Sequence, residues 1–277
     1  MPDPIVITRN GHRTWLKWHR GRRTLSDPVF TGQRIVEGMR LGASVEVDLV
    51  VTGDKGFAVL HDMTLDRETT GSGAVAATRD AQIRTLKLRD NDGAPIDEPV
   101  MLLDDLCALI AKAGAHPDAL LQLDYKEDEL VLDAQALANF ARATGPVARN
   151  MIVSSGSAKA VSMLTGAVPG MRAGFDPSDE VVFKTALTEG KLQGFVDNAL
   201  AASPGADMIY LAWQIVTLSA EAGFDIVDAF HKAGKRVDAW TIQASDTAAV
   251  AVVEKLLACK VDQITTDDPE GLVAAVG

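Results

Sequence analysis

The chain has 277 residues and a net charge of −11, and 47% of its residues are hydrophobic and 23% charged. This composition is that of a globular protein and excludes a disordered chain. The acidic balance argues against a protein that binds the nucleic-acid backbone, which needs a basic face.

Two cysteines, Cys107 and Cys259, are too few for a disulfide framework, and we expect reduced, buried thiols. The N-terminus lacks the basic start and apolar run of a signal peptide. No stretch approaches the ~20 apolar residues needed to cross a bilayer. We therefore expect a cytoplasmic protein without a membrane span.

Short β-rich runs alternate with helical patterns along the chain. Strands are predicted, in chain order, at 15–19, 45–51, 120–126, 151–155, 171–175, 208–213, 236–242 and 263–266. Helices are predicted between and after them, at 31–41, 102–113, 132–143, 158–164, 180–202, 220–233, 247–258 and 270–276. Strict alternation indicates parallel strands joined by crossover helices.

Eight such units predict an α/β fold, a closed (β/α)₈ TIM barrel, which typically takes about 250 residues. An open doubly wound sheet is the alternative, but the Gly-x-Gly-x-x-Gly signature expected after its first strand is absent. Residues 52–101 interrupt the alternation between the second strand and its helix. A structureless loop of this length is unusual inside a domain. We predict a small inserted lobe over the barrel mouth, within one catalytic domain that spans residues 1–277.

Chemistry in such barrels takes place at the C-terminal ends of the strands. The candidate residues there, with one histidine from the insertion, are His19, Arg20, Glu46, Asp48, His61, Asp124, Lys126 and Trp240. A lone acidic residue is usually an ordinary surface charge. Glu46 and Asp48 are harder to explain as surface charges, because apolar residues surround them and because residues two apart on a strand share a face.

Carboxylates that converge at a barrel mouth repel one another. A like-charged pair 4 Å apart costs about 4 kcal/mol at an effective dielectric of 20. A divalent cation removes that cost, and oxygen ligands alone favour Mg²⁺ or Ca²⁺ over Zn²⁺. The pattern therefore predicts a metal site at Glu46, Asp48 and Asp124.

Several ordered motifs resemble those of the glycerophosphodiester phosphodiesterase family. His19-Arg20-Gly21 is similar to its His-Arg-Gly signature, and Glu46-Val47-Asp48 and His61-Asp62 are similar to its acidic pair and its His-Asp element. Later motifs follow in the same order, at Thr69-Thr70-Gly71-Ser72-Gly73, Trp240-Thr241 and Thr265-Thr266-Asp267-Asp268-Pro269. The resemblance spans residues 18–272.

The resemblance implies a metal-dependent hydrolase that splits glycerophosphodiesters, or a related small phosphodiester, into an alcohol and a phosphomonoester, with a place in lipid metabolism. His19 and His61 would be its acid–base pair. Arg20 and Lys126 would contact the phosphate, Trp240 would line the substrate side, and Mg²⁺ or Ca²⁺ would sit on the acidic trio. The expected partner is a small phosphodiester and not a nucleic acid, and a homo-oligomer is left open.

The chain departs from the family pattern in three places, the first of which is a heavy first strand, Trp15-Leu16-Lys17-Trp18. Asp124 stands where a glutamate is usual, and Arg22 and Arg23 stand where the family continues with Pro-Glu-Asn-Thr. Arginine binds carboxylate and phosphate groups bidentately. We therefore predict that Arg22 or Arg23 holds a second anionic or polyhydroxyl group of the substrate. The alternative is a solvated turn that pairs with Asp27 or Glu37.

A buried ion pair is predicted beneath the site. Lys17 lies two residues before His19, and Asp238 lies two residues before Trp240, so each is expected one layer deeper in the barrel. Both residues come from odd-numbered strands of the barrel, and the side chains of alternate strands form common layers inside it. We expect the two side chains to meet, because an unpaired buried charge costs roughly 3–5 kcal/mol.

Three other functions compete with hydrolysis. A lyase-like reaction would release a cyclic phosphate, and the residues do not separate it from hydrolysis. A sugar-phosphate aldolase or isomerase would hold phosphate in Gly-rich turns after strands seven and eight, where this chain has Gln243-Ala244-Ser245 and Asp267-Asp268-Pro269. A barrel kept only for ligand binding would be expected to have lost His19 or His61, and this chain has both.

Overall fold

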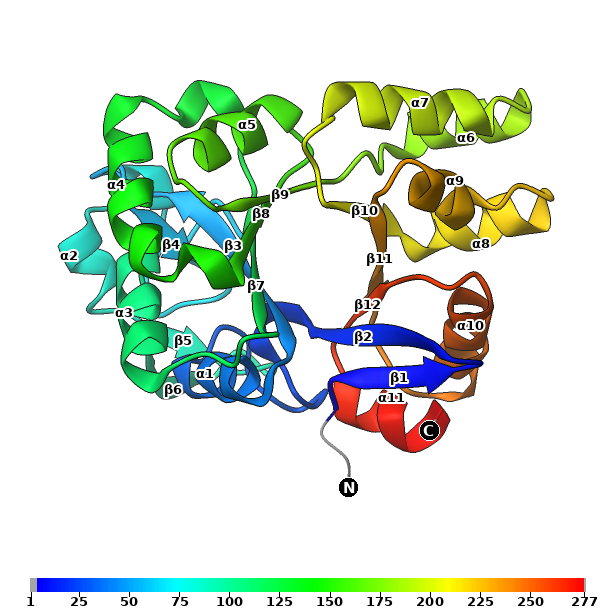
Figure 1. Cartoon of the computed structure of the whole chain (residues 1–277). Helices are drawn as coiled ribbons and strands as arrows, with labels where there is room; N and C mark the ends of the chain where they lie inside the picture. Colours follow the sequence, from blue (N-terminus) through cyan, green and yellow to red (C-terminus); the bar gives the residue numbers. More distant parts are fainter. Residues whose placement is uncertain (1–3, 277) are drawn as a thin grey trace.

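The computed structural model describes residues 4–276, and within them parallel strands form a closed barrel (Figure 1). Its strands are β2 (His12–Trp18), β3 (Ser44–Val51), β7 (Leu120–Tyr125), β8 (Met151–Ser154), β9 (Arg172–Phe175), β10 (Met208–Ala212), β11 (Arg236–Ile242) and β12 (Gln263–Thr266). Each strand pairs in parallel with the next, and β2 closes the ring by pairing with both β12 and β3. The predicted (β/α)₈ barrel is confirmed.

Helices surround the barrel in the order α1 (Gly32–Leu41), α3 (Leu103–Ala113), α4 (Ala134–Thr144), α5 (Ala158–Gly166), α6 (Glu180–Thr188), α7 (Leu192–Ala202), α8 (Trp213–Glu221), α9 (Ile226–Lys232), α10 (Thr247–Ala258) and α11 (Pro269–Val276). Short 3₁₀ turns lie at His19–Gly21, Val75–Ala77, Glu129–Val131 and Gly145–Asn150. Many helices begin where a side chain accepts a backbone N–H, as Ser157 does from Ala160 and Asp246 from Ala249. No helix of the described residues is long and apolar enough to cross a membrane.

Two predicted helices were wrong in extent. The helix expected over 180–202 is the pair α6 and α7, and the one expected over 220–233 is replaced by α8 and α9. Gly190 and Gly223 stand at the breaks with φ of 67° and 80°. Glycine in this left-handed region ends a helix at little cost, which explains both interruptions.

The first barrel strand also differs from its prediction. It begins earlier, at His12, and forms an antiparallel hairpin with β1 (Val6–Arg9), which the sequence reading missed. It ends at Trp18, and His19 therefore opens the 3₁₀ turn that follows the strand. This position places His19 at the C-terminal rim of the barrel.

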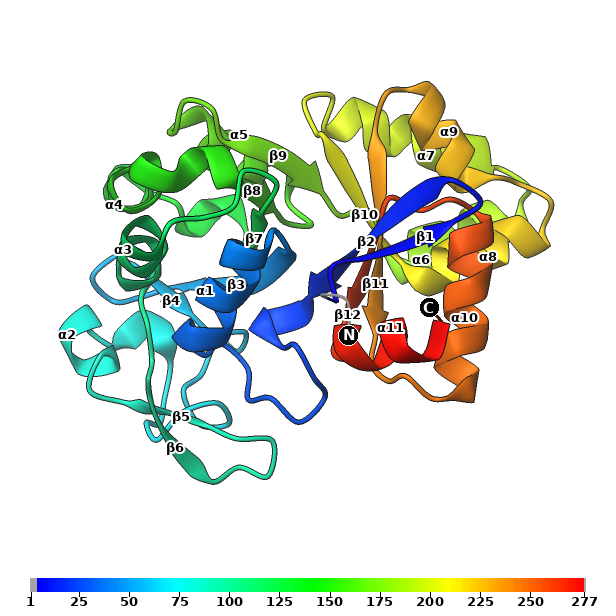
Figure 2. The same ribbon diagram turned by 60° about the horizontal axis from the view of Figure 1, so that its bottom comes forward.

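The insertion contains β4 (Phe57–Val59), α2 (Asp80–Ile83) and a hairpin of β5 (Lys87–Arg89) and β6 (Pro95–Pro99). β4 pairs with β3, and Val75, Ile83 and Leu88 are buried in the same apolar cluster as β3 and α3. In Figure 2 the β5–β6 hairpin lies at the lower left edge of the molecule. The expectation of one domain over residues 1–277 stays a prediction.

The barrel interior combines buried polar side chains with a small apolar cluster of Leu120, Ile152, Met208 and Tyr210, whereas the outer wall packs against apolar helix faces. Lys17 Nζ lies 3.2 Å from Asp238 Oδ2, and both side chains are at most 1% exposed. The predicted buried ion pair is therefore confirmed. Asp238 also accepts hydrogen bonds from Gln263 and Thr265, which satisfy its remaining lone pairs.

Candidate active site

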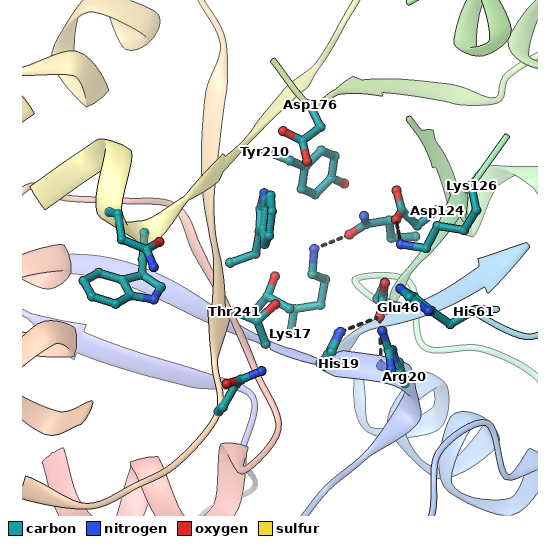
Figure 3. A pocket seen from close by; sticks show the side chains of 16 residues that line it. Lys17, His19, Arg20, Glu46, His61, Asp124, Lys126, Asp176, Tyr210 and Thr241 are labelled. Carbon is teal, nitrogen blue, oxygen red and sulfur yellow. Dashed lines mark hydrogen bonds and ion pairs between the residues drawn. The ribbon is translucent and has the colours of Figure 1, made fainter. Parts of the chain in front are cut away.

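A cavity of about 400 Å³ opens at the C-terminal end of the barrel (Figure 3). Among the predicted site residues, those that line it are His19, Arg20, Glu46, His61, Asp124, Lys126 and Trp240. Asp48 lies behind this wall and is fully buried. Arg22 and Arg23 do not line it. Residues from four strand ends and the insertion thus meet around one space.

The turn His19–Gly21 presents the first histidine. Arg20 has φ of 53° and Gly21 has φ of 74°, both in the left-handed region. A Cβ on Gly21 would lie 2.7 Å from Ile35 Cγ1, so the turn requires glycine there. The backbone N–H of Arg20 donates to Glu46 Oε2 at 2.8 Å, which joins this turn to β3. Left-handed non-glycine residues of this kind cluster at functional sites.

Each histidine is held by a carboxylate at Nδ1. His19 Nδ1 lies 2.7 Å from Asp267 Oδ1, and His61 Nδ1 lies 2.8 Å from Asp62 Oδ1. An ionised carboxylate only accepts, so Nδ1 carries the proton in both rings. Nε2 of each ring is then left available to a substrate.

The orienting carboxylates are ionised at neutral pH. A hydrogen bond from Arg67 is the largest cause that lowers the pKa of Asp62 to about 2. Burial acts to raise the pKa of Asp267, but the hydrogen bond and charge of His19, aided by Arg22, outweigh it, and the pKa is lowered. Both carboxylates can therefore stabilise a protonated imidazole.

Glu46, Asp48 and Asp124 form a cluster in which one oxygen of each lies within 4.8 Å of the others. Both oxygens of Asp48 are buried and make no hydrogen bond of good geometry, and a cationic nitrogen lies within 3.0 Å of each. Burial, followed by the charge of Glu46, raises the pKa of Asp48. A cation bound by these oxygens would give them ligand bonds and would favour the ionised form of Asp48. A set of hard oxygen donors fits Mg²⁺ or Ca²⁺.

Two cationic side chains neutralise part of this cluster. Arg20 Nε lies 3.0 Å from Asp48 Oδ2, and Lys126 Nζ lies 2.7 Å from Asp48 Oδ1 and also contacts Asp124. Burial acts to lower the pKa of Lys126, but the carboxylates of Asp124 and Asp48 outweigh it and raise the pKa. Lys126 is therefore a charged ammonium at the cavity wall, suited to a phosphate oxygen.

Residues that the sequence reading missed hold Asp124 in place. Ser154 Oγ donates to Asp124 Oδ1 at 2.5 Å, Gln122 Nε2 donates to Ser154 Oγ at 2.8 Å, and Lys17 donates to Gln122. Gln122 lies two residues before Asp124, so the alternation of the strand could have revealed it. The chain of hydrogen bonds links the metal-ligand candidate to the buried ion pair below.

Asp176 was also missed, although it follows the end of a predicted strand. It lines the same cavity opposite His19, as Figure 3 shows, and accepts a hydrogen bond from the backbone of Ser178. Burial is the main cause that raises its pKa to about 7. Asp176 is thus a carboxyl that can carry a proton near neutral pH.

The two arginines after Gly21 diverge. Arg23 turns away from the cavity and pairs with Glu37 at 2.5 Å and Glu270 at 2.7 Å, so the structure does not support its predicted contact with substrate. The alternative of a pairing with Glu37 is observed. Arg22 points the other way, with Nη1 3.3 Å from Asp267 Oδ1 and Nη2 donating to Asn91 at 2.6 Å.

The family model described as "Glycerophosphoryl diester phosphodiesterase family" matches residues 35–271. No curated protein sequence matches the chain.

Solved structures similar to this chain share its fold. A Silicibacter pomeroyi protein assigned as a glycerophosphoryl diester phosphodiesterase is 20% identical, with a TM-score of 0.71 over 95% of this chain and 92% of that one. A glycerophosphodiester phosphodiesterase of Agrobacterium tumefaciens is also 20% identical, with a TM-score of 0.65 over 94% and 99%. An Oleispira antarctica phosphodiesterase in complex with the product sn-glycerol-3-phosphate is 18% identical, with a TM-score of 0.64 over 94% and 96%.

Proposed function

The chain belongs to the glycerophosphoryl diester phosphodiesterase family, and we propose that it hydrolyses a glycerophosphodiester to an alcohol and a phosphomonoester by acid–base catalysis between His19 and His61. One observation carries the proposal: two histidines, each oriented by a carboxylate, line the same cavity as an acidic cluster and a charged lysine. Family membership also argues against the aldolase or isomerase alternative.

The histidines supply the proton transfers. Phosphodiester cleavage requires a base to take a proton from the attacking hydroxyl and an acid to protonate the departing alkoxide. With Nδ1 of each ring occupied by a carboxylate, Nε2 of one histidine can accept a proton while Nε2 of the other donates one. Asp267 and Asp62 stabilise the imidazolium form of whichever ring holds the proton.

Two cationic side chains, Lys126 and Arg20, bind the scissile phosphate. Lys126 and Arg20 face the cavity next to the acidic cluster, and they are suited to neutralise the non-bridging oxygens as charge develops on them. Glu46, Asp48 and Asp124 would hold Mg²⁺ or Ca²⁺, which when bound supplies positive charge to the phosphate and lowers the pKa of a hydroxyl. Trp240 contributes an apolar face to the same cavity.

The substrate class rests on the family and on a structural neighbour. The Oleispira antarctica phosphodiesterase holds sn-glycerol-3-phosphate as its product, and we extend this class of product to the present chain. The experiment is a panel of glycerophosphodiesters, lysophospholipids and sugar phosphodiesters with Mg²⁺, Ca²⁺ or Mn²⁺. Cleavage of a glycerophosphodiester supports the proposal, and cleavage of none of them would overturn it.

A cyclic phosphate is the alternative product. A hydroxyl on the substrate itself can attack phosphorus in place of water, and the same two histidines would serve that reaction. Phosphorus NMR of the reaction distinguishes the two outcomes, because a five-membered cyclic phosphate and a phosphomonoester give separate resonances. We expect a phosphomonoester to accumulate.

A further inference from the structure

A second cavity adjoins the catalytic one. It has a volume of about 520 Å³, and the basic residues on its wall are Arg20, Arg22, Arg67 and Arg89. Arg20 also lines the catalytic cavity, so the two spaces share this side chain. Glu68 and Asp90 are the carboxylates on the wall. Four arginines and two carboxylates therefore line this cavity, in a chain whose net charge is −11.

Both carboxylates are already used by the backbone. Glu68 Oε2 accepts the N–H groups of His61 at 2.9 Å and Asp62 at 3.0 Å. Asp90 Oδ1 accepts the N–H groups of Asp92 and Ala94 within its own turn. These bonds fix the loops, and Glu68 Oε1 also lies 3.2 Å from Arg67 Nη2, so neither carboxylate pairs with Arg89.

Arg89 is the least compensated of the four. Its Nε donates to the backbone oxygen of Thr69 at 2.6 Å and its Nη1 to that of Gly93 at 2.7 Å. It forms no ion pair with a carboxylate among residues 4–276. Arg22 Nε is buried and has no hydrogen-bond partner there. Arg20, Arg22 and Arg67 pair with Asp48, Asp267 and Asp62. The charge of Arg89 and the unused donors of Arg22 and Arg89 therefore remain for a ligand.

The inserted lobe completes the cavity. Arg67 and Arg89 come from the insertion, whereas Arg22 comes from the loop after β2. Asn91 joins the two segments, because it accepts from Arg22 and donates to the backbone oxygen of Leu25 at 3.2 Å. The lobe thus carries two arginines to the edge of the catalytic cavity.

We propose that this cavity is an anion subsite, and that it holds a phosphate or carboxylate group carried by the second alcohol of the substrate. The inference rests on the proposed phosphodiesterase function and specifies its substrate class: a glycerophosphodiester with an additional anionic group beyond the scissile phosphate. Guanidinium groups bind such oxyanions bidentately. Arg20 lies between the two spaces and so separates the scissile phosphate from the second anion.

The test compares glycerophosphoglycerol with its derivative that bears a terminal phosphomonoester. Affinities are measured by calorimetry in the His61→Ala variant, which slows cleavage, and kcat/KM values are measured in the wild-type enzyme. We expect the phosphorylated diester to bind at least ~10-fold more tightly, as one charged bidentate contact can provide. Arg89→Gln in the His61→Ala background should reduce this preference to ~3-fold or less.

Arg23→Gln is the matched control, because Arg23 belongs to the same arginine run but faces Glu37 and Glu270. It should leave the affinity ratio at its original value. Arg89→Lys, which keeps the charge, should retain more of the preference than Arg89→Gln. Arg22→Gln provides a second test if Arg89→Gln does not fold.

Equal affinities for the two diesters, or equal losses of preference in Arg89→Gln and Arg23→Gln, would overturn the anion subsite. Failure to cleave these two diesters and every other glycerophosphodiester of the panel would instead overturn the proposed function. The two failures are distinguishable because binding is measured separately from turnover.

Discussion

His61 and Asp62 are neighbours in the chain, yet their side chains form the contact that sets the proton position on the histidine. Asp62 stays ionised because Arg67 holds its pKa at about 2. His61→Ala and His19→Ala should each lower kcat by about 10²–10⁴-fold, the usual contribution of general acid–base catalysis. Steady-state kinetics on a glycerophosphodiester measures this loss, and wild-type kcat in either variant would refute its role.

Asp62→Asn should lower kcat less than loss of the ring itself, because the amide still occupies the position but no longer stabilises an imidazolium. Asp66→Asn is the control in the same loop, since within residues 4–276 the Asp66 side chain accepts a hydrogen bond only from the backbone of Gly73. Its kcat should match that of the wild type. Equal kcat in Asp62→Asn and Asp66→Asn would show that the His–Asp contact does not contribute.

Asp176 makes stability depend on pH. Its pKa is raised to about 7 in the folded protein, chiefly by burial, whereas an unfolded aspartate has a pKa of about 3.9. Between these values the folded state holds a proton that the unfolded state has released, so stability falls as pH rises through about 4 to 7.

Asp176→Asn removes this dependence. Relative to the wild type, the variant should gain stability as pH rises from 5 to 8, by on the order of 1 kcal/mol after allowance for solvent at the cavity. Urea denaturation at several pH values measures the difference. A difference that is constant with pH would contradict the assignment.

At the scale of elements, the His-Arg-Gly turn depends on one glycine. Gly21→Ala would place a Cβ 2.7 Å from Ile35 in a backbone with φ of 74°, and should cost roughly 1–3 kcal/mol and displace His19. Gly166→Ala in α5 is the control, because no atom lies within 4 Å of its added Cβ. Thermal melts should show a lower Tm for Gly21→Ala alone. A Tm and kcat equal to those of the wild type would mean that the turn tolerates a side chain.

Periodicity predicted the barrel strands well, because apolar alternation and flanking glycines are local signals. It joined α6 to α7 because the apolar pattern continues across Gly190, whose left-handed conformation is a local choice that the pattern does not contain. Asp267 and Asp176 were missed as site residues for another reason. Asp267 contacts His19, and Asp176 lines the same cavity as His19, although both lie far from His19 along the chain. Only closure of the barrel brings these residues together.

At the scale of the whole molecule, Lys17 and Asp238 tie the first barrel strand, β2, to β11, which lies on the far side of β12, beneath the site. Lys17→Met should destabilise the protein by roughly 3–5 kcal/mol, because Asp238 would be left as an unpaired buried charge. The double variant Lys17→Met/Asp238→Asn should lose less than the sum of the two single losses. Denaturant unfolding of the four proteins completes this cycle, and strict additivity would show that the pair does not interact.

We propose that a divalent cation and two histidines together cleave a phosphodiester in the barrel cavity. The decisive measurement is phosphorus NMR of a glycerophosphodiester incubated with exhaustively chelated enzyme, and then with added Mg²⁺ or Ca²⁺. We predict no change in the diester resonance under chelation, and growth of a phosphomonoester resonance once the ion is restored. Full conversion by the chelated enzyme, or no conversion after either ion is added, would contradict the claim.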